Sequence, residues 1–538
     1  MAPPQGPLST PKEVTSSSLT SPTSWSPRTS QFTGTASDKR ELPGRTALPE
    51  SHNALSSPVI RSPTSSPLTM PAPSFTTLIT VCSEPPACSV PLSSRFLTVK
   101  RSPILTTTTE ALFSMIGTIR ALTSRRLACL RSHSDGSESL RLDLNSAITT
   151  VINLMLSMMQ SLLIQGRGKF NCSGLDPATC NVTNPECSLF TTTVVPGKTY
   201  RLRVTSMASL SSLSFQIEGH NLTVVESDGY NVEPFTVNKL FIYSGETYSV
   251  LLKADQDPSR NYWMATDVVS RKPTTPQGIA ILNYYPNWRM KSPPNGTPPG
   301  PQWDDKAPRI RQSVTIKARS GYEEKPPVKA DKVIVLLNTQ NKLDGHMRWS
   351  LNNVTFDIPK TPYLISLKYN LSKQFTEAPP PEGYDAVNYD IWSPPPNPNV
   401  TASDGIYKIK LNSTVDIVLQ NANTLTVNNS ETHPWHLHGH DFWVLGYGEG
   451  KFDAQKDPLS YNLDNPIQKN TVPVHPYGWT AIRYRADNPG VWFFHCHVEA
   501  HLHMGMGIVL EEGAEQVGRL PKSIMGCGSS KTLTALLT

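Results

Sequence analysis

Short alternating runs dominate the chain from residue 188 onward, and they constrain its fold more than any other feature. Residues 200–205, 222–226, 247–252 and 333–337 are rich in β-branched and aromatic side chains. Glycine, asparagine, aspartate and proline punctuate these runs, and helical periodicity is scarce. The pattern predicts an all-β chain built from β-sandwiches.

Composition divides the chain into two unlike parts. Residues 1–160 are rich in serine, threonine and proline, contain none of the 17 tyrosines, and hold only Trp25 of the ten tryptophans. Such a stretch buries too little apolar surface to offset its ordering entropy, so taken alone it is expected to be disordered. We expect one sandwich over 161–315 and, beyond a proline-rich linker near 286–308, a second over 330–520.

Charge and apolar runs limit the partners of the chain. A net charge of +6 over 538 residues gives no reason to expect a nucleic-acid partner. The best apolar run, 151–164, is too short and too polar to span a bilayer, so no membrane partner is expected. No signal peptide is visible at the start of the sequence.

Sequons and cysteines nevertheless indicate a secretory route. Cys172, Cys180 and Cys187 lie close together in a polar segment, as is typical of an extracellular disulfide region. Nine sequons for N-glycosylation all follow residue 161, at Asn171, Asn181, Asn221, Asn295, Asn353, Asn370, Asn399, Asn412 and Asn428.

Two histidine clusters near the C-terminal end carry the chemistry. The first is His433-Pro-Trp-His-Leu-His-Gly-His440, and the second runs from His495-Cys-His497 to Met506. On strands, His436 and His438 would share a face, whereas Cys496 would point away from His495 and His497. Adjacent residues would thus offer imidazoles to one site and a thiolate to another.

A thiolate, two imidazoles and a weak thioether describe a blue-copper electron-transfer site. The residues that can supply this set are Cys496, His433, His501 and Met506. The remaining imidazoles that suit further copper are His436, His438, His495 and His497. The Cys496 backbone would then be a short covalent route for electrons between the two sites. Zinc is the alternative metal for such residues, and His440 and His503 have no clear ligand role.

Residues 433–452 and 488–513 resemble the copper motifs of the multicopper oxidases, most closely those of the plant L-ascorbate oxidases. The similarity extends from Ser161 to about Thr532 and includes the string Tyr243-Ser-Gly-Glu. It implies tandem cupredoxin-like Greek-key β-sandwiches, of which two are recognisable here and three are present in the family. Laccases share the framework but commonly carry leucine or phenylalanine where Met506 stands.

The resemblance also implies roles for single residues. The type 1 copper ligands would be His433, Cys496, His501 and Met506. His436 would bind type 2 copper, and the type 3 pair would be bound by His438, His495 and His497. Electrons would pass through Cys496, His495 and His497 from ascorbate to O2, and Trp349 and Arg271 would line the ascorbate pocket. A Cys172–Cys180 disulfide, an apoplastic location and a homodimer are further implications.

The chain departs from the family pattern in its N-terminal part, where the family's first domain would lie. The family's trinuclear centre takes eight histidines, four of them from the first domain in H-W-H-G and Y-H-x-H motifs. Before residue 430 the sequence has only His52, His133, His220 and His346, and none of them form a pair. The type 1 site is therefore expected to be complete and the type 2 and type 3 sites only half present.

A shift of reading frame offers an explanation for this departure. Read one nucleotide earlier, the segment from residue 32 allows HWHGIRQ, that from residue 76 allows YHSHYGMQRAAGL, and 116–140 allows DWYHKSTYEQAACLSSIPFRWVGEP. We hypothesise that residues up to about 140 are an out-of-frame reading of domain 1, and that 141–160 has no family counterpart. The sandwich over 161–315, which corresponds to the family's second domain, would then lack its first strand and expose a sheet edge.

Three functions remain open from the sequence. The leading one is an L-ascorbate:oxygen oxidoreductase, inactive in O2 reduction if half of its trinuclear centre is missing. The second is a laccase-like phenol oxidase, and the third is a non-catalytic cupredoxin protein or a one-copper electron carrier. Copper stoichiometry and relative activity on ascorbate and a phenol separate them.

Overall fold

The structure is a computed structural model. It describes residues 76–82, 162–168, 188–208, 210–273, 275–371, 373–396, 398–521, 524 and 528–530, and of 76–82 only the backbone. All of them belong to one compact unit, Ser51–Thr538. The predicted disulfide cysteines Cys172 and Cys180 lie outside the described residues, and so does most of the segment assigned to a shifted frame.

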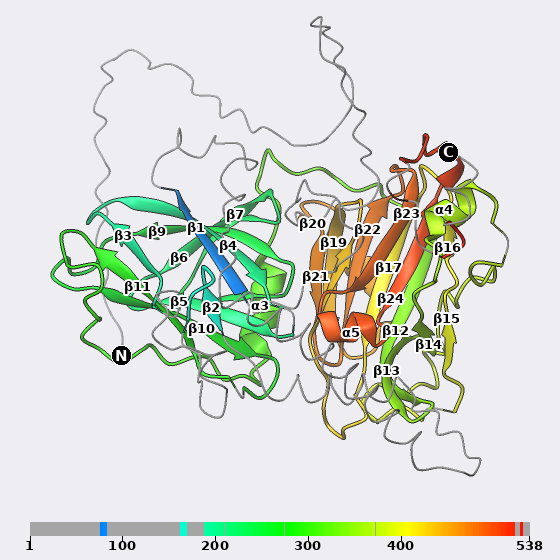
Figure 1. The fold of residues 1–538 in the computed structure, drawn as a ribbon, viewed down its shortest axis with the longest axis horizontal. Coiled ribbons are helices and arrows are strands. Elements are labelled where there is room, and N and C mark those ends of the chain that lie inside the picture. Colours follow the sequence, from blue (N-terminus) through cyan, green and yellow to red (C-terminus); the bar gives the residue numbers. More distant parts are fainter. Residues whose placement is uncertain are drawn as a thin grey trace, which may run out of the picture. The chain divides into compact units, whose positions relative to one another are not determined.

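The first sandwich consists of two facing sheets (Figure 1). Its strands are β1 (Thr76–Cys82), β2 (Leu163–Ile164), β3 (Thr191–Val194), β4 (Thr199–Met207), β5 (Ser212–Ile217), β6 (Leu222–Ser227), β7 (Tyr230–Val237), β8 (Leu240–Ile242), β9 (Thr247–Lys253), β10 (Tyr262–Val269) and β11 (Gly278–Tyr284). One sheet has the order β2-β1-β4-β9-β6-β7 and the other β3-β11-β10-β5-β8. Strand β4 buries Tyr200, Leu202 and Val204 at alternate positions, as the sequence pattern predicts.

Strand β1 corrects the expectation of an exposed sheet edge. It pairs antiparallel with β4 along its whole length, from Thr76 opposite Met207 to Cys82 opposite Arg201. Thr76–Cys82 is the only part of the N-terminal 160 residues that the structure describes, and the prediction of disorder for the region as a whole stays a prediction. The edge of β4 that we expected to be exposed is covered, because the open N–H and C=O groups of a sheet edge recruit any extended segment within reach.

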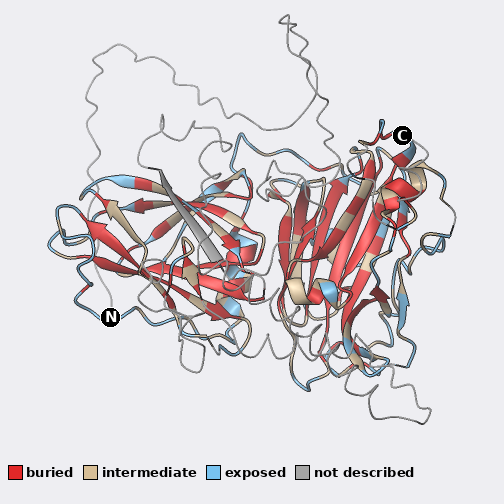
Figure 2. Cartoon of the chain, in the orientation of Figure 1, coloured by how far each residue is buried: buried red, intermediate tan, exposed pale blue. Residues whose placement is uncertain are grey.

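The second sandwich is larger. Its strands are β12 (Lys332–Leu343), β13 (His346–Leu351), β14 (Val354–Phe356), β15 (Thr401–Ser403), β16 (Tyr407–Ile409), β17 (Thr414–Asn421), β18 (His433–Leu437), β19 (Phe442–Glu449), β20 (Gln468–Lys469), β21 (Thr471–Val474), β22 (Gly478–Arg485), β23 (Gly490–Cys496) and β24 (Gly507–Glu512). Eight strands form a sheet in the order β15-β14-β13-β12-β17-β22-β19-β20, and five form the order β16-β24-β23-β18-β21. Figure 2 shows that buried residues follow these strands.

In the part of the chain that the structure describes, helices are few and short, so the predicted all-β class is confirmed. They are α3 (Ala307–Thr315), α4 (Tyr363–Lys368), α5 (Glu499–His503) and the 3-10 turns η4 (Asp457–Ser460) and η5 (Ala514–Gln516). Among the described residues, none of the helices has the length and hydropathy to cross a membrane. Helix α3 carries Arg309, which is 2% exposed and donates from Nη1 to Thr432 Oγ1 at 3.1 Å.

A buried charge cluster links the two sandwiches. Lys469 Nζ lies 3.2 Å from Asp228 Oδ2 and 3.2 Å from Glu246 Oε1, and all three side chains are 1% exposed. The ammonium also donates to Ser227 Oγ at 2.6 Å. Because isolated buried charges are costly, the cation and the two carboxyls depend on one another.

The carboxyl of Glu246 predicts a pH dependence of stability. Burial raises its pKa from 4.5 to about 7, with Lys469 opposing and Asp228 adding to the shift. A raised folded-state pKa contributes stability below the unfolded value and loses it as pH rises through the folded value. We therefore expect the melting temperature to fall between pH 5 and 8, and to fall less in Glu246→Gln, which carries no titrating group. An unchanged pH profile in this variant, measured by calorimetry, would show that Glu246 does not titrate in this range.

Candidate metal centre

Pairing of β18 with β23 places the two histidine clusters side by side. Trp435 lies opposite Cys496, and His436 lies opposite His495. Because successive side chains alternate between faces, His433 and Cys496 point into the sandwich, whereas His436 and His495 point to the other face. The predicted division of the ligands into two sets, joined by adjacent residues, is thus present in the sheet.

The inner set converges on one point. Cys496 Sγ lies 3.8 Å from His433 Nδ1 and 3.7 Å from His501 Nδ1, and the two Nδ1 atoms are 3.2 Å apart. An ion bonded at about 2.0 Å to nitrogen and about 2.3 Å to sulfur spaces its ligand atoms by about 3.3–3.8 Å. The spacing therefore fits a metal held by all three side chains, without rearrangement of the chain.

Burial sets the protonation of these groups. Cys496 and His433 are fully buried and His501 is 9% exposed. Burial lowers the pKa of His433 from 6.5 to about 3 and holds the pKa of His501 well below its usual value, so both imidazoles stay neutral. Burial raises the pKa of the Cys496 thiol, so a thiolate there needs a cation beside it. Neutral imidazoles and a cation-dependent thiolate are the donor set of a soft metal site.

A short loop carries the other two predicted ligands of this set. Helix α5 presents His501, and the chain then turns so that Met506 N–H donates to His501 O at 2.9 Å. The Cys496 N–H donates to Met506 O at 3.0 Å, which ties the fully buried Met506 to the cysteine. Trp349 packs against both imidazoles, with ring centroids 4.6 Å from His433 and 4.8 Å from His501.

Gly505 is required for this loop to close. Its φ is +99°, and a Cβ there would lie 2.4 Å from Thr355 Cγ2 and 3.0 Å from the backbone oxygen of Trp349. Gly505→Ala should lower the free energy of unfolding by roughly 1–3 kcal/mol more than Gly197→Ala. Gly197 has a similar φ of +78° but open space around it, so it separates backbone strain from collision. Equal losses in denaturant titrations of the two variants would contradict the packing argument.

The outer set gathers four imidazoles. Ring centroids are 5.0 Å apart for His436 and His438, 5.2 Å for His438 and His495, and 5.6 Å for His436 and His497. His438 Nε2 lies 3.1 Å from His495 Nε2. Burial lowers the pKa of all four, that of His438 to about 4, so they too are neutral and able to donate lone pairs.

Neighbouring groups fix which nitrogen each imidazole presents. His436 Nδ1–H donates to Asn470 O at 2.9 Å, and His495 Nδ1–H donates to Cys496 O at 2.9 Å. The Ser244 hydroxyl donates to Ala208 O, so its oxygen accepts from His497 Nδ1–H at 3.0 Å. The Nε2 lone pairs of these three histidines are thereby left to a ligand, as is usual for metal-binding imidazoles.

The loop with Ser244 belongs to the first sandwich. At its neighbour Gly245, where φ is +89°, a Cβ would lie 2.8 Å from the ring of His497. The string Tyr243-Ser-Gly-Glu, which the resemblance singled out, is therefore the surface on which His497 rests. Sequence reasoning assigned no contact to it, because nothing in the sequence pairs residues 253 positions apart.

The two predicted substrate residues relate differently to the inner set, because Trp349 packs on its imidazoles and Arg271 acts on its surroundings through its charge. Trp349 is only 1% exposed, so its ring contacts imidazoles and is not open to a substrate. His501 Nε2, on the opposite side of the ring from Cys496, lies 3.5 Å from Glu431 Oε2, and the Glu431 side chain is 34% exposed. Burial raises the pKa of Glu431, and the charge of Arg271 opposes that shift. Sequence reasoning missed Glu431, although it stands only two positions before His433.

Three other histidines have partners of their own. His440 Nε2 lies 3.1 Å from the buried carboxylate of Glu512, and His503 Nε2 lies 3.3 Å from Glu499 on the outer side of α5. His475, which sequence reasoning left unassigned, is buried with its Nε2 3.0 Å from Ser313 Oγ on α3. His440 and His503 thus each contact a glutamate that lies outside the two ligand sets.

Comparison with known proteins supports this architecture. Two family models described as multicopper oxidase match residues 140–287 and 375–516. The first match includes 141–160, contrary to our expectation that this stretch has no family counterpart. A laccase from Botrytis aclada has the same fold, with a TM-score of 0.53 at 21% identity over 73% of this chain and 65% of that chain.

Curated relatives are more similar in sequence. An L-ascorbate oxidase of Cucumis sativus is 50% identical over 379 residues, which cover 69% of this chain and 64% of the relative. One of Cucurbita pepo var. melopepo is 49% identical, with 69% and 68% covered, whereas Laccase-11 of Arabidopsis thaliana is 38% identical, with 59% and 58% covered. The chain thus spans about two thirds of the length of these ascorbate oxidases. This protein belongs to the multicopper oxidase family.

Proposed function

We propose that the chain is a secreted copper oxidoreductase of the L-ascorbate oxidase type, a class of enzyme that takes electrons from ascorbate and delivers them to O2. The observation that carries the proposal is the convergence of Cys496, His433 and His501 on one face of a sheet whose other face presents four imidazoles. Copper at the inner set would supply one-electron redox chemistry, and copper at the outer set would supply a binding site for O2.

The proposed ligands follow the two faces. The type 1 ligands are His433, Cys496, His501 and Met506. His436 is a type 2 ligand, and the type 3 ligands are His438, His495 and His497. With copper bound at both sets, the backbone that joins Cys496 to His495 and His497 would be a short covalent route for electrons. The hydrogen bond from His495 Nδ1–H to Cys496 O adds a second connection between the two residues.

The reductant is proposed to approach at His501. The edge of this imidazole carrying Nε2 points toward Glu431, the partly exposed carboxyl next to the inner set. The positive charge of Arg271, which belongs to the first sandwich, acts to lower the pKa of both Glu431 and His501. We propose that Arg271 offsets the negative charge of Glu431 so that an anionic reductant such as ascorbate can approach. Trp349 holds the two imidazoles in position from the buried side.

Arg271→Met tests this approach route. The variant leaves the negative charge of Glu431 without its counter-charge, so bleaching of the copper–thiolate band by ascorbate should slow roughly tenfold, the effect of one partly screened charge. The rate with an uncharged phenol should stay the same, which makes the phenol an internal control for folding and copper loading. Equal slowing with both reductants would place Arg271 outside the reductant site. In the unmodified chain, faster bleaching by the phenol than by ascorbate would favour a laccase-like enzyme.

Reduction of O2 is proposed to need ligands that this reading frame does not encode. Four one-electron oxidations of ascorbate are required for each O2 reduced to water, and the family pattern uses eight histidines for that step. The sequence offers four of them in the two clusters. As given, the chain would accept an electron at its type 1 site without completing the reaction, which is the one-copper carrier alternative.

A cDNA read across the codons for residues 1–165 tests the origin of this gap. If the shifted frame is present, the natural product carries both missing motifs and acts as an ascorbate oxidase. If the given frame is confirmed, the oxidase reaction describes the ancestry of the chain and the carrier function stands. An apoplastic location and a homodimer are part of the proposal by resemblance alone.

A further inference from the structure

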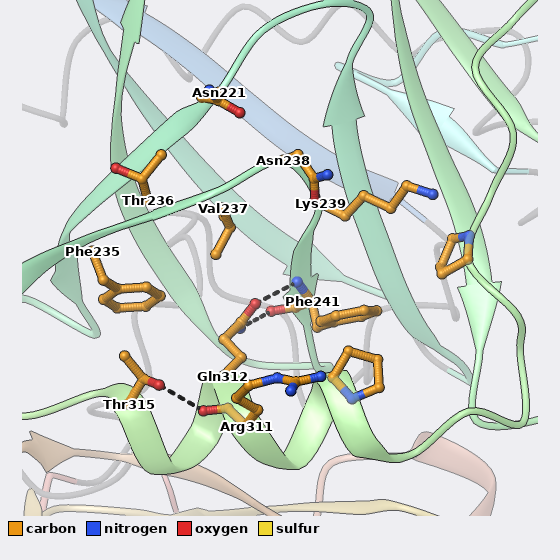
Figure 3. Close-up of a pocket in the computed structure, with 12 residues that line it drawn as sticks. Asn221, Phe235, Thr236, Val237, Asn238, Lys239, Phe241, Arg311, Gln312 and Thr315 are labelled. Atoms are coloured by element: carbon orange, nitrogen blue, oxygen red, sulfur yellow. Dashed lines mark hydrogen bonds between the residues drawn. The ribbon is translucent and has the colours of Figure 1, made fainter. Parts of the chain in front are cut away.

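A cavity of about 580 Å³ lies in the first sandwich, away from both ligand sets. Figure 3 shows it between the β7–β8 turn, with Asn238 and Lys239, and helix α3, with Arg311, Gln312 and Thr315. The volume is within the roughly 300–1,000 Å³ of small-molecule sites. Nothing in the proposed redox reaction uses this cavity.

The lining mixes apolar faces with hydrogen-bonding groups. Phe235, Phe241 and two prolines supply the apolar faces, and Asn238, Lys239 and Arg311 supply polar groups. Gln312 holds helix α3 against the backbone of Phe241 at the bottom of the cavity. Its side chain accepts from Phe241 N–H at 2.9 Å and donates to Phe241 O at 2.6 Å (Figure 3). Flat apolar surface with a few polar groups at its margins is suited to the two kinds of face that a sugar ring presents.

One residue at the cavity is also the acceptor asparagine of an N-glycosylation sequon. Asn221, at its rim, heads the sequon Asn221-Leu222-Thr223 and is exposed, whereas the Leu222 side chain is fully buried. The sequon asparagines that the structure describes are all exposed, at Asn221, Asn295, Asn353, Asn370, Asn399, Asn412 and Asn428. None of the buried asparagines among the described residues heads a sequon. Exposure of every described sequon is what a chain glycosylated on its way out of the cell would show.

We propose that Asn221 carries an N-linked glycan and that the N-acetylglucosamine core of this glycan lies in the cavity against Phe235 and α3. In the secretory pathway the Asn221 amide nitrogen loses a proton and bonds to C1 of an oligosaccharide, which leaves its lipid-diphosphate carrier. The core then joins the turn before β6 to helix α3 as a covalently tethered ligand. The proposal rests on the secretory route proposed above and is independent of copper chemistry.

Release of glycans from the folded protein tests the proposal. The full chain is secreted from a eukaryotic host, treated with a peptide:N-glycosidase under native conditions, and followed site by site by glycopeptide mass spectrometry. Asn399 is the internal control, because it is an exposed sequon that does not line the cavity. Release from Asn221 should be at least about tenfold slower than from Asn399, because the core must leave the cavity before cleavage.

Variants separate burial of the glycan from its attachment. Phe235→Ala and Arg311→Ala keep the sequon and should bring release at Asn221 close to the rate at Asn399, while Thr223→Ser should retain both the glycan and its protection. A secreted chain with glycan on Asn399 but none on Asn221 would overturn the proposal without touching the secretory route. Equally fast release at the two sites in the unmodified chain would overturn it as well. Absence of glycan at every sequon would instead remove the secretory route itself.

Discussion

Replacing Cys496 by serine is expected to abolish the copper–thiolate absorption of the protein and to lower the rate at which ascorbate reduces its copper by at least about 100-fold. Loss of a residue that supports a ligand costs about 10–100-fold, and loss of the only thiolate of the set should cost more. The fold should persist, because serine is smaller than cysteine and fits the buried position between His433 and His501.

His503→Gln is the matched control for this variant. His503 stands on the same short helix as His501, but its side chain is 42% exposed and contacts Glu499. Its replacement should leave the absorption and the reduction rate unchanged. A serine variant that still binds copper with the same absorption would contradict the assignment of Cys496, whereas loss of copper from both variants would indicate damage to α5 and not to the ligand set.

Replacing Lys469 by methionine is expected to lower the free energy of unfolding by about 3–5 kcal/mol, the usual cost of removing one partner of a buried ion pair. The variant leaves the carboxyls of Asp228 and Glu246 buried with no cation between them. Methionine has nearly the same length as lysine, so loss of packing contributes little. Urea titration at neutral pH measures the change.

Two comparisons sharpen this prediction. Lys456→Met removes a lysine that is 83% exposed and paired with Asp453, and it should change stability by no more than about 0.5 kcal/mol. Adding Asp228→Asn and Glu246→Gln to Lys469→Met should recover much of the loss, because the buried charges are then gone together. A loss below about 1 kcal/mol for Lys469→Met alone would mean that water enters the cluster or that the sandwiches separate there.

Local pattern predicted the strands and the two ligand faces. Alternation in residues 200–205 became β4, and the succession of His495 and Cys496 placed the imidazole and the thiol on opposite faces of β23. These inferences succeed because strand periodicity is two and depends only on neighbours in sequence. The same rule gave His436 and His438 a common face.

Contacts between distant segments could not be predicted from local pattern. Ser244 fixes the tautomer of His497 across 253 residues, and Lys469 on β20 meets Asp228 and Glu246 of the first sandwich. Such pairs follow from how two sandwiches pack, which alternation within one strand does not encode. Strand β1 shows the same limit, because composition alone suggested no strand at Thr76–Cys82.

Copper content, measured together with the visible absorption of the purified full chain, tests whether the inner set is a type 1 copper site. We expect about one tightly bound copper per chain, held by His433, Cys496 and His501, with an intense thiolate-to-copper band. Bound copper without that band, or retention of zinc in place of copper, would contradict the assignment of the inner set. Four coppers per chain would show that the outer imidazoles bind copper with the help of other ligands. This result would contradict the prediction that the type 2 and type 3 sites are only half present.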